Sequence, residues 1–376
     1  MKVAFFIGSL NRGGAETLLL DIFRRKNDAP FECMLIYRNE GDLSDEFRAT
    51  GVPMFRLKPR HGAFAYFSDL RHLLKENKVD ILHTHTVANG VIGILSTCFS
   101  GIKLAASFHG FISMLKYMVF THLIMWFADR SIFVSNYERD WFLSHVLLAP
   151  RNRCEVVYNG IDFSKFDASP VEPDFLKEEA SVEDSCLRMT MVGNFVSGRS
   201  QLFLCKALKA LSDKGSLDFR FYFIGKQSLK EPERWDDCLR YCRDNHLLGD
   251  KVVFLGGRAD VPSVLQYMDA FVYASECDSF GIAVVEAMAA GVPVIVNDWI
   301  VMKEVTQNGE WASIYKTDDI DDCVAKIEDL ARTTAEKRNK ALALSEVVRH
   351  RFSIENHIQN LYLIYKSLLS DDTAED

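Results

Sequence analysis

Residues 270–297 read AFVYASECDSFGIAVVEAMAAGVPVIVN, and this stretch decides the fold. The run AFVYAS has the β-branched and aromatic character of a strand, and a polar loop follows it. Good helix formers come next, and VPVIVN then reads as a second strand. A strand, a helix and a strand in this order are typical of a parallel sheet. The loop carries Asp278 and the helix carries Glu286, eight positions further on.

The same alternation of short strands and helical patterns runs along most of the chain. Strands are predicted at 3–8, 33–37, 80–85, 103–108 and 130–135, and again at 187–193, 219–225, 251–256, 270–275 and 292–297. Helical patterns follow, among them 15–26, 66–77, 88–99, 112–127 and 136–147. Residues 167–186, with two prolines and many acidic residues, interrupt the alternation and predict an interdomain connection. The sequence therefore predicts two Rossmann-like α/β domains that face each other across a cleft.

Composition narrows the class of protein. The 376 residues are 48% hydrophobic and 26% charged, which is ordinary for a globular protein with a core. The net charge of −8 is unevenly distributed along the chain. Residues 1–170 hold 20 Lys and Arg against 17 Asp and Glu and are slightly basic, so the rest of the chain is acidic. No dense basic stripe with interleaved aromatic residues occurs, so nucleic acid is not an expected partner. The nine cysteines are scattered without a CxxC pair, which indicates a reduced, cytoplasmic protein without a zinc site.

The longest apolar stretch is FISMLKYMVFTHLIMWF at 111–127, and it is shorter than the ~20 residues of a membrane span. Lys116 and His122 also interrupt it. The stretch indicates either a buried helix of the first domain or a helix that lies on the inner face of a membrane. The cations that would suit a membrane face are Lys103, Lys116, Arg24, Arg25 and Lys26.

The loop and helix after strand 270–275 suit a sugar nucleotide. Ligands of open parallel sheets bind beyond the carboxyl ends of the strands, so we expect Asp278 to point into the cleft. Asp278 would accept hydrogen bonds from sugar hydroxyls, and the backbone N–H groups near Phe280 and Gly281 would bind a phosphate at the helix start. Glu286, about two turns into the helix, would accept bonds from ribose hydroxyls. Two acids eight positions apart are common by themselves, so the surrounding pattern carries the prediction.

That pattern resembles the signature of the retaining nucleotide-sugar glycosyltransferases of family 4, which adopt the GT-B fold. The family usually has E-G-F-G where this chain has Asp278, Ser279, Phe280 and Gly281. FIGSLNRGGAETLLLDI at 6–22 resembles the opening strand, glycine loop and helix of the family. RFSIENHIQNLYLIYKSLL at 351–369 resembles its closing helix, which crosses back to the N-terminal domain. The resemblance implies an acceptor-side domain of residues 1–167 with about 357–376, and a donor-binding domain of residues 168–356.

The resemblance also implies roles for particular residues. Gly13 and Gly14 would let the backbone approach the donor phosphate and the acceptor, unless they only serve a turn with positive φ. His109, in ASFHGF, would contact the donor sugar. Where the family has an Arg and a Lys that grip the diphosphate, this chain has Asn194 and Arg199. A guanidinium binds diphosphate oxygens in a bidentate way, so Arg199 is the predicted anion ligand.

Three further regions carry weaker expectations. The backbone near Gly257 and Arg258 would cradle the nucleotide base. Glu304 would lie near the rim of the cleft. His83 and His85 share one face of a strand, but without a third ligand they predict strand-end packing or an acceptor contact rather than a metal site.

The resemblance thus implies a metal-independent transferase that moves a sugar from a UDP- or GDP-linked donor to a hydroxyl acceptor. His109, Asp278 and Arg199 are the predicted catalytic residues, and the resemblance implies retention of the anomeric configuration. The expected acceptor is a cell-surface glycan or a lipid-linked glycan. Two alternatives stay open: a GT-B sugar-nucleotide epimerase or hydrolase, and a non-catalytic protein that binds sugar nucleotides.

Overall fold

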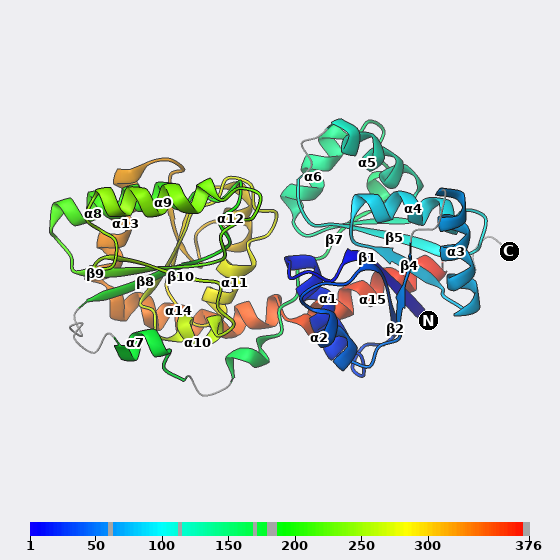
Figure 1. The fold of residues 1–376 in the computed structure, drawn as a ribbon, viewed down its shortest axis with the longest axis horizontal. Helices are drawn as coiled ribbons and strands as arrows, with labels where there is room; N and C mark the ends of the chain where they lie inside the picture. The colour runs from blue at the N-terminus through cyan, green and yellow to red at the C-terminus, as the bar shows by residue number, and fades with distance from the viewer. Residues whose placement is uncertain (59–62, 112–114, 168–170, 179–185, 371–376) are drawn as a thin grey trace. The chain divides into compact units, whose positions relative to one another are not determined.

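The chain folds into two α/β units in the computed structural model, which describes residues 1–58, 63–111, 115–167, 171–178 and 186–370 (Figure 1). The first unit comprises Met1–Asp162 and the segment from Phe352 onward. The second unit comprises Phe163–Arg351. The chain therefore leaves the first unit once and returns to it near its C-terminus.

The first unit contains a seven-stranded parallel sheet in the order β3-β2-β1-β4-β5-β6-β7. Its strands are β1 (Lys2–Ser9), β2 (Glu32–Asn39), β3 (Met54–Arg56), β4 (Ile81–Thr84), β5 (Lys103–Phe108), β6 (Arg130–Phe133) and β7 (Cys154–Val156). One face of this sheet packs against α1 (Gly14–Arg24), α2 (Ser44–Ala49) and α15 (Ile354–Ser370). The other face packs against α3 (Ala63–Glu76), α4 (Val87–Thr97), α5 (Leu115–Phe127) and α6 (Asn136–His145).

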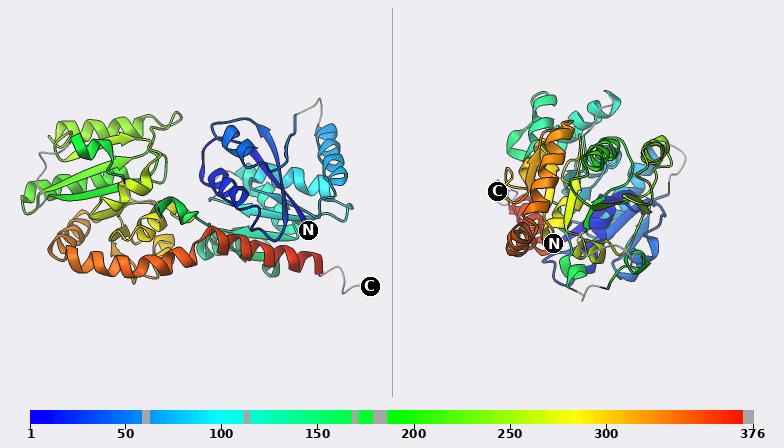
Figure 2. Two further views of the ribbon diagram at one scale, coloured as in Figure 1. Left: turned by 90° about the horizontal axis from the view of Figure 1, so that it is seen from below. Right: turned by 90° about the vertical axis from the view of Figure 1, so that its left-hand side faces the viewer.

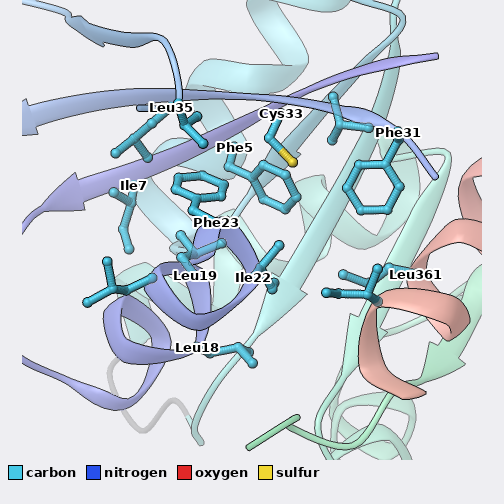
Figure 3. Packing of buried hydrophobic residues seen from close by; sticks show 14 of the residues in the cluster. Phe5, Ile7, Leu18, Leu19, Ile22, Phe23, Phe31, Cys33, Leu35 and Leu361 are labelled. Atoms are coloured by element: carbon cyan, nitrogen blue, oxygen red, sulfur yellow. The ribbon is translucent and has the colours of Figure 1, made fainter. Parts of the chain in front are cut away.

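The closing helix α15 belongs to the core of the first unit (Figure 2). Its buried residues Ile354, Ile358, Leu361 and Tyr365 recur at a helical period and form one apolar stripe. Figure 3 shows Leu361 beside the cluster around Phe5 and Phe23, whose rings meet edge to face at 5.4 Å. The expectation that the C-terminal helix crosses back to the N-terminal domain is confirmed.

The second unit contains a six-stranded parallel sheet in the order β10-β9-β8-β11-β12-β13. Its strands are β8 (Leu187–Val192), β9 (Phe219–Ile224), β10 (Val252–Gly256), β11 (Ala270–Tyr273), β12 (Val294–Asn297) and β13 (Ser313–Tyr315). Its helices are α7 (Asp174–Glu178), α8 (Gln201–Lys214), α9 (Glu233–Asp244), α10 (Val261–Gln266), α11 (Ile282–Ala289), α12 (Ile300–Val305), α13 (Ile320–Arg332) and α14 (Thr334–Arg351).

The strand order of each sheet reverses direction at one point. In the first unit the reversal lies between β1 and β4, and in the second it lies between β8 and β11. At such a switch point the loops leave the sheet in opposite directions, and the space between them is the usual ligand site of the fold. The loops that follow β8 and β11 carry Arg199 and Asp278, so the fold brings these two residues to one place.

The structure also contains short elements that the sequence patterns did not predict. The edge strands β3, β7 and β13 have three residues each. The short helix α7 lies in the stretch 167–186, which we expected to be an interdomain connection. Residues 168–170 and 179–185 of that stretch, and residues 112–114 of the predicted helix 112–127, lie outside the described residues. Within the described ranges, no helix is both long and apolar enough to cross a membrane.

Candidate functional site

Backbone hydrogen bonds fasten the loop after β8 to the loop after β11. Ser200 donates its N–H to the carbonyl oxygen of Ala274 at 3.2 Å, and Glu276 donates to that of Gly198 at 2.8 Å. The hydroxyl of Ser200 also donates to Glu276 Oε1 at 2.6 Å. These bonds fix the relative positions of the two loops, so the side chains between them are pre-organised.

Arg199 and Asp278 are brought together by this arrangement. The guanidinium Nη2 lies 3.7 Å from Asp278 Oδ1, which is longer than an N–H···O hydrogen bond. Arg199 Nε is buried and has no hydrogen-bond partner in the structure. The guanidinium also passes close over Gly193, where a Cβ would lie 2.3 Å from Arg199 Nη1. Arg199 therefore keeps N–H donors for an incoming anion, and Gly193 leaves it the room.

Three neighbours hold the Asp278 residue itself. The buried Tyr273 hydroxyl donates to Asp278 Oδ2. The Asp278 N–H donates to Ser275 Oγ at 3.1 Å, and the Trp299 indole N–H donates to the Asp278 carbonyl oxygen at 3.0 Å. Only Oδ1 of the carboxylate therefore lies toward Arg199, and the carboxylate is fixed in one orientation.

The electrostatics of this group favour a permanently charged Arg199. The pKa of the guanidinium is raised by the neighbouring Tyr273 oxygen and by Asp278, against the opposing effect of burial. Burial raises the pKa of Tyr273 well above its usual value, so its hydroxyl stays protonated and can donate to Asp278. The site thus presents one fixed cation beside one oriented carboxylate.

The start of α11 lies directly after this loop. Phe280 is buried, and Gly281 has φ +85°, a left-handed conformation that an L side chain rarely adopts. A Cβ at Gly281 would also lie 2.7 Å from Met302 Cε. Glycine therefore lets the chain turn from the loop into the helix. Glu286 follows on α11 and is partly buried.

Asn194 has a structural role that the sequence did not suggest. Its Oδ1 accepts the Lys226 N–H at 2.9 Å, and its carbonyl oxygen accepts from Gln201 Nε2 at 3.2 Å. Asn194 thus ties the loop after β8 to the loop after β9. Arg258 belongs to the segment that we expected to cradle the nucleotide base. Its side chain pairs with Asp260 at 2.6 Å and lies over the Phe175 ring of α7 at 5.0 Å.

In the first unit, the predicted glycine loop has ordinary backbone angles. Gly13 precedes α1 with φ −150° and ψ 174°, and Gly14 is the first helical residue. Gly14 is not among the residues with positive φ, so the turn with positive φ that we weighed for this pair is wrong. A Cβ at Gly13 would lie 2.5 Å from Glu16 Oε2, but that atom ends a flexible side chain that can move aside, so the contact does not by itself require glycine.

His109 is partly buried and forms a chain with the buried His83 and His85 at the carboxyl ends of β4 and β5. His109 Nε2 lies 3.0 Å from His85 Nδ1, and the two rings stack at 5.3 Å. His83 contacts the Tyr365 hydroxyl at 2.6 Å and Ser107 Oγ at 2.7 Å. Burial lowers the pKa of His83 to about 3 and of His109 to about 4, so both rings are neutral near pH 7. No group of three or more His, Cys, Asp or Glu among the described residues is placed to hold a metal ion.

A depression of about 380 Å³ in the second unit borders the Arg199 loop. Lys206 of α8 and Arg234 of α9 line it together with Arg199. Arg234 Nη2 also donates to Ser197 Oγ at 3.2 Å. Asp237, Glu276 and Asp318 line the same depression, so its cationic and acidic side chains are equal in number.

Sequence reasoning missed the residues that orient the site. Tyr273 lies inside the predicted strand 270–275, and Trp299 lies 21 positions beyond Asp278. Asn297, at the end of β12, bonds both the N–H and the carbonyl oxygen of Ser275, at 3.1 and 2.7 Å. The sequence did contain one signal for these residues: polar side chains occur where predicted neighbouring strands end. Parallel strands end at one edge of the sheet, so such side chains are expected to lie close together.

Comparisons with known proteins agree with this fold. The family model described as "Glycosyltransferase Family 4" matches residues 12–165, and the model described as "Glycosyl transferases group 1" matches residues 175–343. The two matches cover most of the chain and coincide with the two units. The chain is a glycosyltransferase of the GT-B fold.

Individual relatives are distant and match over most of their length. The chain is 24% identical over 302 residues to the UDP-Gal:alpha-D-GlcNAc-diphosphoundecaprenol alpha-1,3-galactosyltransferase of Escherichia coli, covering 76% of each chain. It is 24% identical over 352 residues to the N-acetyl-alpha-D-glucosaminyl L-malate synthase of Bacillus anthracis, covering 91% of this chain and 88% of that enzyme. The structure of Anabaena Alr3699/HepE in complex with UDP and glucose superposes with a TM-score of 0.85 at 19% identity, covering 98% of this chain and 100% of that one.

Proposed function

We propose that the protein transfers a hexose from a UDP-sugar to a hydroxyl group of a cell-surface glycan or glycolipid precursor, with retention of the anomeric configuration. The single observation that carries this proposal is the Arg199–Asp278 pair at the switch point of the second sheet. UDP rather than GDP is supported by the Anabaena protein, which binds UDP and glucose. A lipid-linked glycan acceptor is supported by the Escherichia coli relative, whose acceptor is a sugar diphosphoundecaprenol.

The second unit would have to stabilise the negative charge of the leaving diphosphate. The bond between the anomeric carbon and the diphosphate oxygen breaks, and that oxygen takes the electron pair. The Arg199 guanidinium and the N–H groups that start α8 and α11 would stabilise the charge that develops there, because such donors need no reorganisation during the reaction. This charge balance would make the transfer independent of a divalent metal. Activity that is unchanged in the presence of EDTA would support this step, and loss of activity that Mg²⁺ or Mn²⁺ restores would refute it.

Asp278 would hold the sugar. With Oδ2 engaged by Tyr273, Oδ1 is the atom that would accept a bond from a sugar hydroxyl. Glu286 would accept bonds from the ribose, the backbone near Gly257 and Arg258 would contact the base, and Asn194 would add a neutral donor. In the first unit, Gly13 and Gly14 would leave room for the phosphate and acceptor, and neutral His109 would bond a sugar hydroxyl.

Retention would follow if the acceptor oxygen attacks the anomeric carbon from the face that the diphosphate leaves. The acceptor proton would then pass to a diphosphate oxygen, and the new glycosidic bond would form without a covalent glycosyl-enzyme. Trapping of a glycosylated side chain during turnover would contradict this route.

The test is a reaction with UDP- and GDP-hexoses, water-soluble glycosides and polyprenyl-diphosphate sugars. Mass spectrometry identifies the product, and the proton coupling of its anomeric centre gives its configuration. We expect a disaccharide-containing product with the configuration of the donor, and its absence with Asp278→Asn. Release of free sugar without transfer to any acceptor, or a product of inverted configuration, would overturn the proposal.

A further inference from the structure

The two histidines of the β4 end differ in how their ring nitrogens are bonded. His83 is fully buried, and both of its nitrogens have partners, the Tyr365 hydroxyl at 2.6 Å and Ser107 Oγ at 2.7 Å. His85 is 5% exposed, and its Nδ1 lies 3.0 Å from His109 Nε2. The Nε2 atom of His85 is buried and has no hydrogen-bond partner in the structure. Packing and hydrogen bonding therefore explain His83 completely, but they do not explain His85.

The unpaired Nε2 of His85 is a cost to folding. A buried polar atom without a hydrogen bond loses its bonds to water and gains nothing in return. A phenylalanine ring would fill a similar space beside the rings of Phe5 and His83, which lie at 5.8 and 4.3 Å, without that cost. Such an atom in a native structure calls for an explanation other than packing. The explanation lies at the ring nitrogen that is bonded, and that nitrogen faces His109.

His85 is held firmly, and it in turn restrains the His109 ring. The His85 N–H donates to the Phe6 carbonyl oxygen of β1 at 3.2 Å, so pairing with β1 continues one residue beyond β4. His109 follows the end of β5, precedes Gly110 and is only partly buried. Its ring stacks on the His85 ring with the centroids 5.3 Å apart and the planes 16° apart. The stack fixes the plane of the His109 ring, and the hydrogen bond fixes its rotation within that plane.

The hydrogen bond also couples the protonation of the two rings. Burial lowers the pKa of His85 well below its usual value and that of His109 to about 4, so both rings are neutral near pH 7. His83 on β4 lowers the pKa of His85 further, and His357 on α15 acts in the same direction on both rings. A neutral imidazole carries one N–H and one bare nitrogen, so exactly one of the two facing nitrogens must hold a proton. The two rings therefore carry their protons either both on Nδ1 or both on Nε2.

We propose that His85 is a positioning residue of the transfer reaction, which holds the His109 ring in the orientation in which that ring hydrogen-bonds the donor sugar. This inference rests on the proposed function, because it concerns the contact between His109 and the sugar. A ring that a neighbour already holds meets the sugar without first losing rotational freedom. UDP alone carries no sugar, so His85 affects the reaction of the UDP-sugar and not the binding of UDP.

Two variants of His85 separate the hydrogen bond from the volume of the ring. His85→Phe keeps a ring and removes the bond, and we expect it to lower kcat/KM for the UDP-hexose about tenfold. His85→Asn places an amide atom near the position of Nδ1 and lacks the unpaired Nε2, so we expect it to stay within about threefold of the unchanged chain. Calorimetric titration should give the same UDP affinity for both variants and the unchanged chain. His72→Phe removes an exposed histidine of α3 and is the control, which should leave all of these values unchanged.

NMR of the ring nitrogens tests the contact without any substrate. The nitrogen shifts of the unchanged chain should show that His85 and His109 carry their protons on the same kind of nitrogen, both Nδ1 or both Nε2. In His85→Phe, the His109 shifts should move toward those of a ring that exchanges between its two tautomers, because the bond that couples it to residue 85 is gone.

The inference is overturned if the two rings carry their protons on different nitrogens, or if His85→Phe transfers sugar with unchanged kcat/KM. It is also overturned if His85→Asn loses as much activity as His85→Phe, or if His85→Phe weakens UDP binding to the same extent as sugar transfer, since the effect would then be a general loss of structure. Absence of transfer by the unchanged chain would refute the proposed function itself, and it is seen before any variant is compared.

Discussion

At the scale of single residues, the site depends on how Asp278 is held. One carboxylate oxygen is bonded to a buried hydroxyl, and the other lies 3.7 Å from a guanidinium. A carboxylate fixed in this way can accept a sugar hydroxyl without first losing side-chain freedom. Asp278 and Arg199 could be predicted from the sequence because each of them belongs to a short, recognisable sequence motif. Tyr273 could not be predicted, because its contact depends on the curve of the loop and not on any spacing.

Replacement of Tyr273 by Phe tests this positioning. We expect kcat/KM for the donor to fall about tenfold, because a hydrogen bond to a charged group contributes roughly 1.5–3 kcal/mol and its loss frees the carboxylate. Tyr315→Phe is the matched control, since that equally buried hydroxyl donates to the Tyr273 carbonyl oxygen at 2.9 Å and does not touch Asp278. Steady-state kinetics and thermal unfolding of both variants distinguish the two roles. Equal loss of stability and activity in the two variants would show that Tyr273 is only structural.

At the scale of elements, the long strands and helices were predictable and the short ones were not. The predicted strand 3–8 corresponds to β1 (Lys2–Ser9), and the predicted helix 15–26 to α1 (Gly14–Arg24). A strand of three residues such as β13 contains too few positions to show a period of two. These residues form a strand because they pair with β12, and the sequence of the three residues alone does not contain that pairing. The same applies to α7, which packs Phe175 against Tyr222 at 5.1 Å.

The histidines between β4, β5 and α15 predict how the first unit responds to acid. His83 and His357 are buried, and their pKa values are lowered to about 3 and about 4. The unfolded chain binds protons at these residues below about pH 6.5, whereas the folded unit does not, so stability falls as the pH drops. We expect a loss of about 2 kcal/mol for each of these histidines between pH 7 and pH 5.

Hydrogen exchange of the α15 amides at pH 7 and pH 5, corrected for the intrinsic exchange rates, measures this loss. His357→Gln should reduce the pH dependence, because glutamine does not titrate. His246→Gln, an exposed position in the second unit, should leave it unchanged. A first unit that is equally protected at both pH values would contradict the expected proton binding.

At the scale of the whole molecule, the two units share one topological feature. Each sheet reverses its strand order once, and each places polar residues at that point: the histidines in the first unit and the Arg199–Asp278 pair in the second. The alternation of strands and helices predicted both sheets, and the closing helix was predicted to return to the first unit. The strand orders were not predictable from local patterns, because they depend on pairings between distant segments.

Donor affinity of an Arg199 variant tests the central claim most directly, namely that one guanidinium neutralises the leaving diphosphate. Calorimetric titration with UDP compares the unchanged chain, Arg199→Met and Arg240→Met, the last removing an exposed arginine of α9. We predict that Arg199→Met weakens UDP binding roughly 10- to 100-fold, since charge-assisted hydrogen bonds to phosphate are among the strong ones, and that Arg240→Met does not. Unchanged UDP affinity in a folded Arg199→Met variant would contradict the account.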